Sequence, residues 1–315
     1  MLLKQVLEVF EILDSPQADG EQVTRLLLDA GVHQAESQRI QGPKGYTDFI
    51  RAVIPGRSGK ISGGKAPTLG IIGRLGGLGA RPERIGFVSD GDGAWVAVSA
   101  ALKLGCMHAL GDILAGDVII ATHICPHAPT RPHDPVPFMD SPVDIATMNK
   151  YEVDPDMDAI LSVDTTKGNR IINHRGFAIS PTVKEGYILR VSENLLDVMS
   201  ITTGRLPVVF AITTQDITPY GNGVYHVNSV LQPATATTAP CVGVAITAEI
   251  PVPGCATGAS HAGDVELAAR FVIEVAKAFG EGKCKFYDEE EYSRLTDLYG
   301  SLSHLKTLGR TNRKD

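Results

Sequence analysis

Apolar residues recur at helical spacing in the first part of the chain. In the first stretch they are Leu3, Val6, Phe10 and Leu13, and in the second, behind Asp19, they are Val23, Leu26, Leu27 and Ala30. This spacing predicts two amphipathic helices. A Gly-, Ser- and Lys-rich link at 55–65 follows them. We therefore expect a helical segment at 1–60 that packs on a main domain at 61–308, with a polar, flexible tail at 309–315.

Short apolar runs alternate with helical patterns in the main domain. The runs lie at 68–72, 85–88, 118–122, 159–163, 208–213 and 242–247, and the helical patterns lie at 94–104, 193–203, 263–279 and 289–305. Such alternation predicts an α/β fold with a mostly parallel central sheet flanked by helices. Ligands of these sheets bind beyond the carboxyl ends of the strands, so polar residues at those ends are the candidate site residues.

The bulk composition narrows the class of partner. The 315 residues carry a net charge of −7 and no long basic run, so we expect no nucleic-acid or membrane partner but a small molecule or short peptide. The five cysteines form no CxxC pair, and we find no export signal or apolar span. These features favour a reducing cytoplasm. Assembly as a homo-oligomer stays open.

Three of the nine histidines fall within 123–133, directly after the apolar run that ends at Thr122. Histidine is the commonest metal ligand and titrates near neutrality, so the stretch predicts metal binding or proton transfer by His123 or His127. The alternative is a Pro-rich surface loop with hydrogen-bonded imidazoles. Cys125 lies in the same stretch, where it is either an activated nucleophile or inert packing.

Carboxylates stand at other predicted strand ends. Asp90 and Asp92 follow the run at 85–88, Asp164 closes the run at 159–163, and His261 precedes the helical pattern at 263–279. An Asp in such a place is often only a helix cap or a turn former. Together, however, the carboxylates and imidazoles suit Zn²⁺, Mn²⁺ or Co²⁺, with one or two ions bound. The predicted ligands are Asp90, Asp92, His123, Asp164 and His261.

Across about residues 65–280 the order of these motifs resembles the co-catalytic zinc aminopeptidases, the tetrahedral- and leucyl-aminopeptidase-like exopeptidases. The motifs are SDGDGAWVAVSAAL at 89–102, AILSVDTT at 159–166 and HAGDVE at 261–266, which follows IPVPG at 250–254. The resemblance implies a zinc-aminopeptidase-like (phosphorylase/hydrolase-like) fold. It also implies that Asp90 or Asp92 bridges two metals, that Asp164 binds one of them and that His261 binds the other. The chain as a whole is similar to an uncharacterised family of hydrolase-like proteins.

Two family motifs are missing from this sequence. The stretch 70–79 lacks the H-x-D motif, and HICPH at 123–127 replaces the paired glutamates. His123 or His127 would then take over metal ligation and proton transfer, or else the peptidase chemistry is lost. Arg74, at the vacated histidine position, is predicted to hold a substrate carboxylate.

Three hypotheses about function follow. The first is a divergent metal-dependent hydrolase of an amide bond in a small peptide or amino-acid derivative, which uses a metal-activated water. The second is a non-catalytic small-molecule-binding protein on a degenerate aminopeptidase-like scaffold. The third is a lyase or isomerase with His127 as a base that needs no metal. In each, Asp216 or Tyr220 of the polar insertion after 208–213 either faces the substrate or forms a turn.

Overall fold

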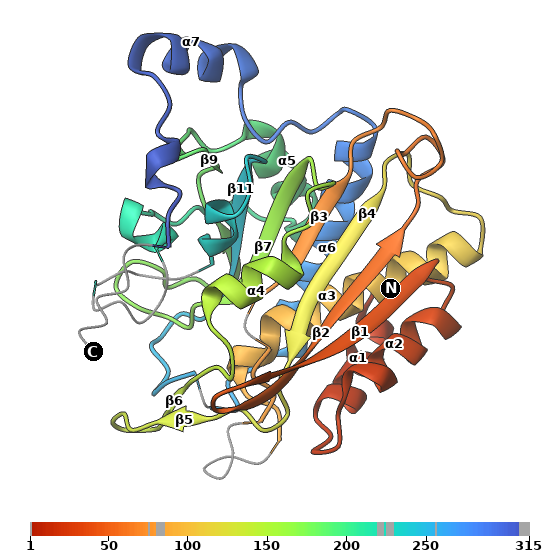
Figure 1. Cartoon of the computed structure of the whole chain (residues 1–315), viewed down its shortest axis with the longest axis vertical. Helices are drawn as coiled ribbons and strands as arrows, with labels where there is room; N and C mark the ends of the chain where they lie inside the picture. Colours follow the sequence, from red (N-terminus) through yellow and green to blue (C-terminus); the bar gives the residue numbers. More distant parts are fainter. Residues whose placement is uncertain are drawn as a thin grey trace.

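In the computed structural model, a central sheet is covered by helices on both faces (Figure 1). The structure describes residues 2–74, 76–79, 86–218, 224, 230–255 and 257–308. Within these residues nine strands form the sheet, in the order β1-β2-β4-β3-β7-β11-β9-β10, with β8 paired to β11. Their bounds are β1 Gln34–Gly42, β2 Gly45–Ile54, β3 Leu69–Gly73, β4 Val118–Ile124, β7 Ala159–Thr165, β8 Gly176–Ile179, β9 Val183–Lys184, β10 Tyr187–Ile188 and β11 Cys241–Thr247. A separate hairpin consists of β5 Thr130–Arg131 and β6 Phe138–Met139.

The sheet is mixed, whereas the sequence predicted a mostly parallel one. The four central strands β4, β3, β7 and β11 run parallel to one another. At one side β2 pairs antiparallel with β4 and β1 with β2, and at the other side β8 and β9 pair antiparallel with β11. The α/β class is therefore confirmed, but the parallel arrangement is limited to the centre, where long buried apolar runs occur.

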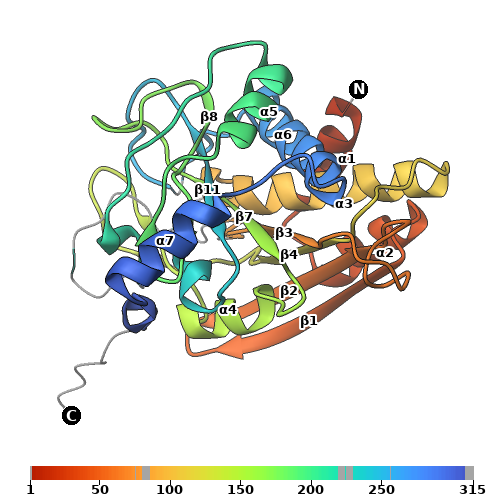
Figure 2. The same ribbon diagram turned by 90° about the horizontal axis from the view of Figure 1, so that it is seen from above.

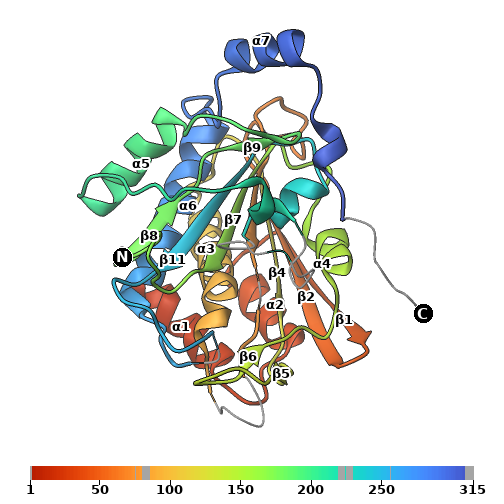
Figure 3. The ribbon, with the colours of Figure 1, turned by 90° about the vertical axis from the view of Figure 1, so that its left-hand side faces the viewer.

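The helices form two layers around this sheet. Their bounds are α1 Leu3–Leu13, α2 Gly20–Asp29, α3 Asp92–Ala109, α4 Ile145–Glu152, α5 Glu193–Thr203, α6 Ala262–Gly280 and α7 Glu289–Tyr299. Figure 2 shows α1, α3, α5 and α6 on one side of the sheet and α4 on the other. Helix α7 stands apart from the sheet (Figure 3) and buries none of its residues.

Alternation along the strands divides the core between the two faces of the sheet. Neighbouring residues of β3 point to opposite faces, so Ile71 packs in the cluster with α3 and α6 while Ile72 packs in the second cluster. Helix α3 is buried on nearly all sides because it lies between the sheet, α1 and α6. The Trp95 indole is buried there and donates to the Val6 carbonyl oxygen at 2.7 Å, which ties α3 to α1.

The N-terminal segment is only partly helical. Helices α1 and α2 form where the periodicity predicted them, and the Asp19 side chain caps α2 by accepting from the Gln22 amide at 2.8 Å. Residues 34–54, however, form β1 and β2, and β2 extends the sheet through its register with β4 (Phe49↔His123). The helical description of 1–60 is thus wrong for its second half, because a partner strand outside the segment completes the pairing.

The other predicted elements agree with the structure, with three exceptions. The pattern at 289–305 is helical only in part, since α7 ends at Tyr299 and a separate 3₁₀ turn forms at Ser303–Leu305. The runs at 68–72, 118–122, 159–163 and 242–247 became β3, β4, β7 and β11, and α3, α5 and α6 are as predicted. The run at 208–213 makes only an isolated bridge between Val209 and Ile179, and residues 86–88 form no strand. Residue 85 and the tail 309–315 lie outside the described residues. No helix in the described ranges has the length and apolar character to span a bilayer.

Candidate functional site

Three predicted site residues meet at the carboxyl ends of the central parallel strands. Arg74 follows β3, His123 lies near the end of β4, and Asp164 lies near the end of β7. The register aligns these ends, because Gly73 lies opposite Thr122 on one side and Val163 on the other. The Arg74 amide also donates to the Val163 carbonyl oxygen at 2.7 Å. The expectation that strand ends converge is therefore met for these residues.

Glu152, the last residue of α4, joins Arg74 to His123. Its two carboxylate oxygens contact Arg74 Nη1 and His123 Nδ1, and all three side chains are at most 3% exposed. His123 Nε2 accepts from the Gly76 amide at 3.4 Å, which places the ring proton on Nδ1, toward Glu152. Burial raises the pKa of Glu152, but Arg74 and His123 outweigh it and hold this pKa below its ordinary value.

Asp92 forms a second buried ion pair. Its Oδ2 lies 2.7 Å from Lys167 Nζ, with the two side chains 0% and 2% exposed, and its Oδ1 accepts from Ser260 Oγ. The N-cap of α3 is Gly91, without a side-chain cap, so Asp92 does not serve as the cap. Burial raises the pKa of Asp92, while Lys167 and Ser260 oppose that rise.

Among the described residues, no cation forms such a pair with Asp164 or with the partly buried Asp90. Burial raises the pKa of Asp164 to about 7, although the Thr165 amide, at 2.7 Å, and Arg74 lower it. Burial also raises the pKa of Asp90 well above its ordinary value, and the negative charges of Asp164 and Asp92 raise it further. Burial thus raises the pKa of both carboxyls, that of Asp164 to about 7.

The remaining predicted site residues lie at the rim or away from these groups. His127 is exposed in the turn after β4. Cys125 is buried, and burial raises the pKa of its thiol to about 12, so it is not an activated nucleophile at neutral pH. His261 is the exposed N-cap residue of α6, near enough to lower the pKa of Asp92. Asp216 is buried and its Oδ2 accepts from the Thr213 amide at 2.7 Å, as in a capping box. Tyr220 lies outside the described residues.

Glu152, Lys167 and Ser260 are functional-site residues that were not among the predicted ones. Glu152 ends a short helix far from His123 along the chain, so no spacing signals the contact. Lys167 carries a usable signal: it stands three residues after Asp164, immediately beyond a strand end that already held a predicted ligand. Ser260 directly precedes the predicted ligand His261, so its position in the sequence carries the same signal.

The predicted zinc ligands fit a co-catalytic metal pair poorly. In the part of the chain that the structure describes, no three His, Cys, Asp or Glu side chains are arranged to hold a metal ion. Asp92, the candidate bridging ligand, gives one oxygen to an ammonium and the other to a hydroxyl. Both ring nitrogens of His123 are engaged, by Glu152 and by Gly76. A bridging carboxylate must instead offer both oxygens to cations.

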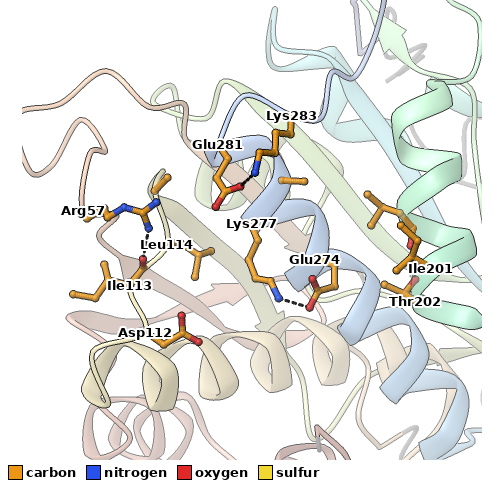
Figure 4. Close-up of a pocket in the computed structure, with 13 residues that line it drawn as sticks. Arg57, Asp112, Ile113, Leu114, Ile201, Thr202, Glu274, Lys277, Glu281 and Lys283 are labelled. Carbon is orange, nitrogen blue, oxygen red and sulfur yellow. Dashed lines mark hydrogen bonds and ion pairs between the residues drawn. The ribbon is translucent and has the colours of Figure 1, made fainter.

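A cavity of about 360 Å³ lies near the opposite edge of the sheet (Figure 4). Its walls come from segments that precede β3 and β4, from α5 and from the end of α6. Four of its charged groups pair with one another, Lys277 with Glu274 and Lys283 with Glu281. This cavity therefore contributes nothing to the ionisable cluster at the carboxyl ends of the strands.

The fold and the cluster define an α/β protein with a buried group of interacting acids and bases at the carboxyl edge of its sheet. The chain belongs to the DUF1177 family, which is described as "Protein of unknown function (DUF1177)" and matches residues 38–309. No curated protein matches the chain. The family assignment brings no activity with it, so the resemblance to zinc aminopeptidases stays a prediction.

Proposed function

We propose that this protein is a hydrolase that cleaves an amide bond in a small peptide or amino-acid derivative with the carboxyls of Asp90 and Asp164. The observation that carries the proposal is that two interacting carboxyls at this edge of the sheet both have a raised pKa, which for Asp164 rises to about 7. Two interacting carboxyls in different protonation states can supply a general base and a general acid at the same pH.

The chemistry needs one water molecule and one proton transfer in each direction. Ionised Asp164 takes a proton from the attacking water while the oxygen of that water bonds to the carbonyl carbon of the substrate. Protonated Asp90 donates to the leaving nitrogen as the carbon–nitrogen bond breaks. Arg74 is fully buried, and its Nε and Nη2 have no hydrogen-bond partner within the described residues. These donors suit a substrate carboxylate or the developing oxyanion.

A bound zinc, manganese or cobalt ion would supply an activated water instead, as the resemblance implies. The residues present favour it less, because Asp92 and His123 are already engaged.

One observation favours a non-catalytic binding protein. The most deeply buried charges already satisfy one another, Asp92 with Lys167 and Glu152 with Arg74 and His123, as in a site that has become structural. For either function we place the protein in a reducing cytoplasm, which its five free cysteines support.

A panel of aminoacyl-chromogenic amides tests the proposal, with chelator and with added zinc, manganese or cobalt. We expect turnover that resists chelation and rises with pH through about 7, as Asp164 ionises. Asp164→Asn should lower kcat by about 10²–10⁴-fold, the range for a lost general base. The exposed Asp112→Asn is the matched control.

The other outcomes separate the rival hypotheses. Turnover that the chelator abolishes and a metal restores would establish the metal-dependent hydrolase. Binding of the panel compounds without turnover, in every buffer, would establish the binding protein.

A further inference from the structure

The guanidinium of Arg74 has one occupied edge and one free edge. Its Nη1 contacts the Glu152 carboxylate, whereas Nε and Nη2 have no hydrogen-bond partner within the described residues, although the side chain is 0% exposed. In a guanidinium, Nε and the outer nitrogen beside it carry two nearly parallel N–H bonds, which match the two oxygens of one carboxylate. Buried charged donors are costly to leave unpaired, so the free edge indicates a ligand with a pair of oxygens.

The contact with Glu152 holds this edge in a fixed orientation. The other oxygen of Glu152 contacts His123 Nδ1, and His123 Nε2 accepts from the Gly76 amide at 3.4 Å. Arg74 therefore cannot turn to satisfy its free donors without breaking a buried ion pair. A donor pair that is already oriented loses little conformational entropy when a ligand binds, which favours affinity.

A second unpartnered group lies on the same face of the sheet. Ser162 of β7 lies opposite Ile72 of β3 in the register. Side chains alternate along a strand, so Arg74, Ser162 and Asp164 lie on one face, on strands about 4.8 Å apart. This is the face that α4 covers, since Glu152 reaches Arg74 from it (Figure 2). The Ser162 hydroxyl is fully buried and, like the free edge of Arg74, has no hydrogen-bond partner in the described ranges.

We propose that Arg74 binds the α-carboxylate of the substrate, so that the substrates are N-acyl amino acids and short peptides cleaved at their carboxyl-terminal residue. This inference rests on the proposed function and narrows it. In such compounds only the α-carbon and the amide nitrogen separate the carboxylate from the scissile carbonyl carbon. A carboxylate on Arg74 therefore brings that carbonyl to the neighbouring strand end, where Asp164 lies. An aminopeptidase, by contrast, recognises the amino end of its substrate.

Calorimetric titration of the unaltered protein with levulinate tests this proposal. In levulinate a methylene group replaces the amide nitrogen of N-acetylglycine, so the ligand cannot be hydrolysed. Levulinamide has the same shape without the charge, and glycinamide offers an amine and no carboxylate. We expect levulinate to bind at least about ten-fold more tightly than levulinamide, because a charged acceptor pairs with both free donors. Equal affinities, a preference for glycinamide, or binding of inorganic phosphate with no response to levulinate would overturn the proposal.

Variants of two arginines locate the binding group. Arg74→Lys keeps the charge but loses the parallel donors, and should weaken levulinate binding at least about ten-fold. Arg51→Lys is the matched control, because Nε and Nη2 of Arg51 are already occupied by Asp154, at 3.0 and 2.7 Å, and it should leave the affinity unchanged. If the lysine variant does not fold, Arg74→Met/Glu152→Gln removes both charges of the buried pair together and should abolish the preference for levulinate over levulinamide. A folded Arg74 variant that keeps this preference would contradict the assignment.

These titrations do not depend on turnover. Binding of levulinate without cleavage of any amide in the panel would support the carboxylate site and end the proposed function. Cleavage of amides that lack a carboxylate, with no preference for levulinate, would support the proposed function and end the carboxylate site. The two failures are therefore distinct.

Discussion

Asp164→Asn should make the protein more stable, by an amount that grows as the pH rises from about 4 to about 7. The unfolded carboxyl loses its proton near its ordinary pKa of 3.8, whereas the folded one keeps it up to about 7. Between these values the native state binds more protons than the unfolded state does, so the free energy of unfolding falls as pH rises. A pKa displaced this far corresponds to about 4 kcal/mol above pH 7, at about 1.36 kcal/mol per unit.

Asparagine removes this cost because it has no charge to bury, and its Oδ1 can still accept from the Thr165 amide, as Asp164 does at 2.7 Å. The gain over the unaltered protein should be close to zero at about pH 4 and reach about 4 kcal/mol at about pH 8. Urea unfolding of both proteins, followed by circular dichroism, measures it, with Asp112→Asn as the exposed control. A gain that is equal at both pH values, or a loss at about pH 8, would refute the reasoning.

Two further perturbations test the packing and the charges around the site. Glu152→Gln leaves the buried Arg74 guanidinium without its carboxylate, and should lower the free energy of unfolding by about 3–5 kcal/mol in urea at neutral pH. The exposed Glu281→Gln should change the free energy of unfolding by less than about 0.5 kcal/mol. Equal effects of the two substitutions would contradict the burial of Glu152. Gly93→Ala should cost about 1–3 kcal/mol in thermal unfolding, because its Cβ would lie 2.5 Å from the Arg74 carbonyl oxygen and 2.6 Å from that of Val163. Gly263→Ala is the control, because the new methyl group faces open space in a helix and should raise the stability by up to about 1 kcal/mol. If Gly93→Ala gave the same gain, α3 would not pack closely against β3 and β7.

The sequence predicted the elements whose burial is encoded in their own residues. The strands of the parallel centre are continuous apolar runs, and their buried positions can be recognised without knowledge of their neighbours. β1 is different, because in QAESQRIQG only Ala35 and Ile40 are apolar apart from the glycine. It becomes a strand through its pairing with β2. β2 was recognisable in principle from the apolar series Phe49, Ile50, Ala52, Val53 and Ile54.

The run at 208–213 shows the opposite error. Its composition favours a strand, but β8 and β9 already pair with β11 at that side of the sheet. The run has only the bridge from Val209 to Ile179. A strand needs a free neighbouring edge as well as suitable residues, and the composition of the run does not reveal which edges are free.

The candidate site divides in the same way. Strand ends predicted the neighbourhood of Asp164, His123 and Arg74, because parallel strands bring their carboxyl ends to one edge. They could not predict the partners. Glu152 contacts His123 from the separate helix α4, and Lys167, which follows β7, contacts Asp92 at the start of α3. Those contacts decide which carboxyls are neutralised and which stay reactive, so the chemistry depends on information that spacing along the chain does not contain.

The position of β4 sets an order of events during synthesis. β2 and β3 emerge from the ribosome before β4, yet both pair with it, and β3 also waits for β7. Until Ile124 has been made, β2 has β1 as a neighbour on one side and lacks its neighbour on the other. The nascent chain is therefore most exposed to self-association and to chaperone capture over this interval, and slow codons or a stalled ribosome there should harm its yield most.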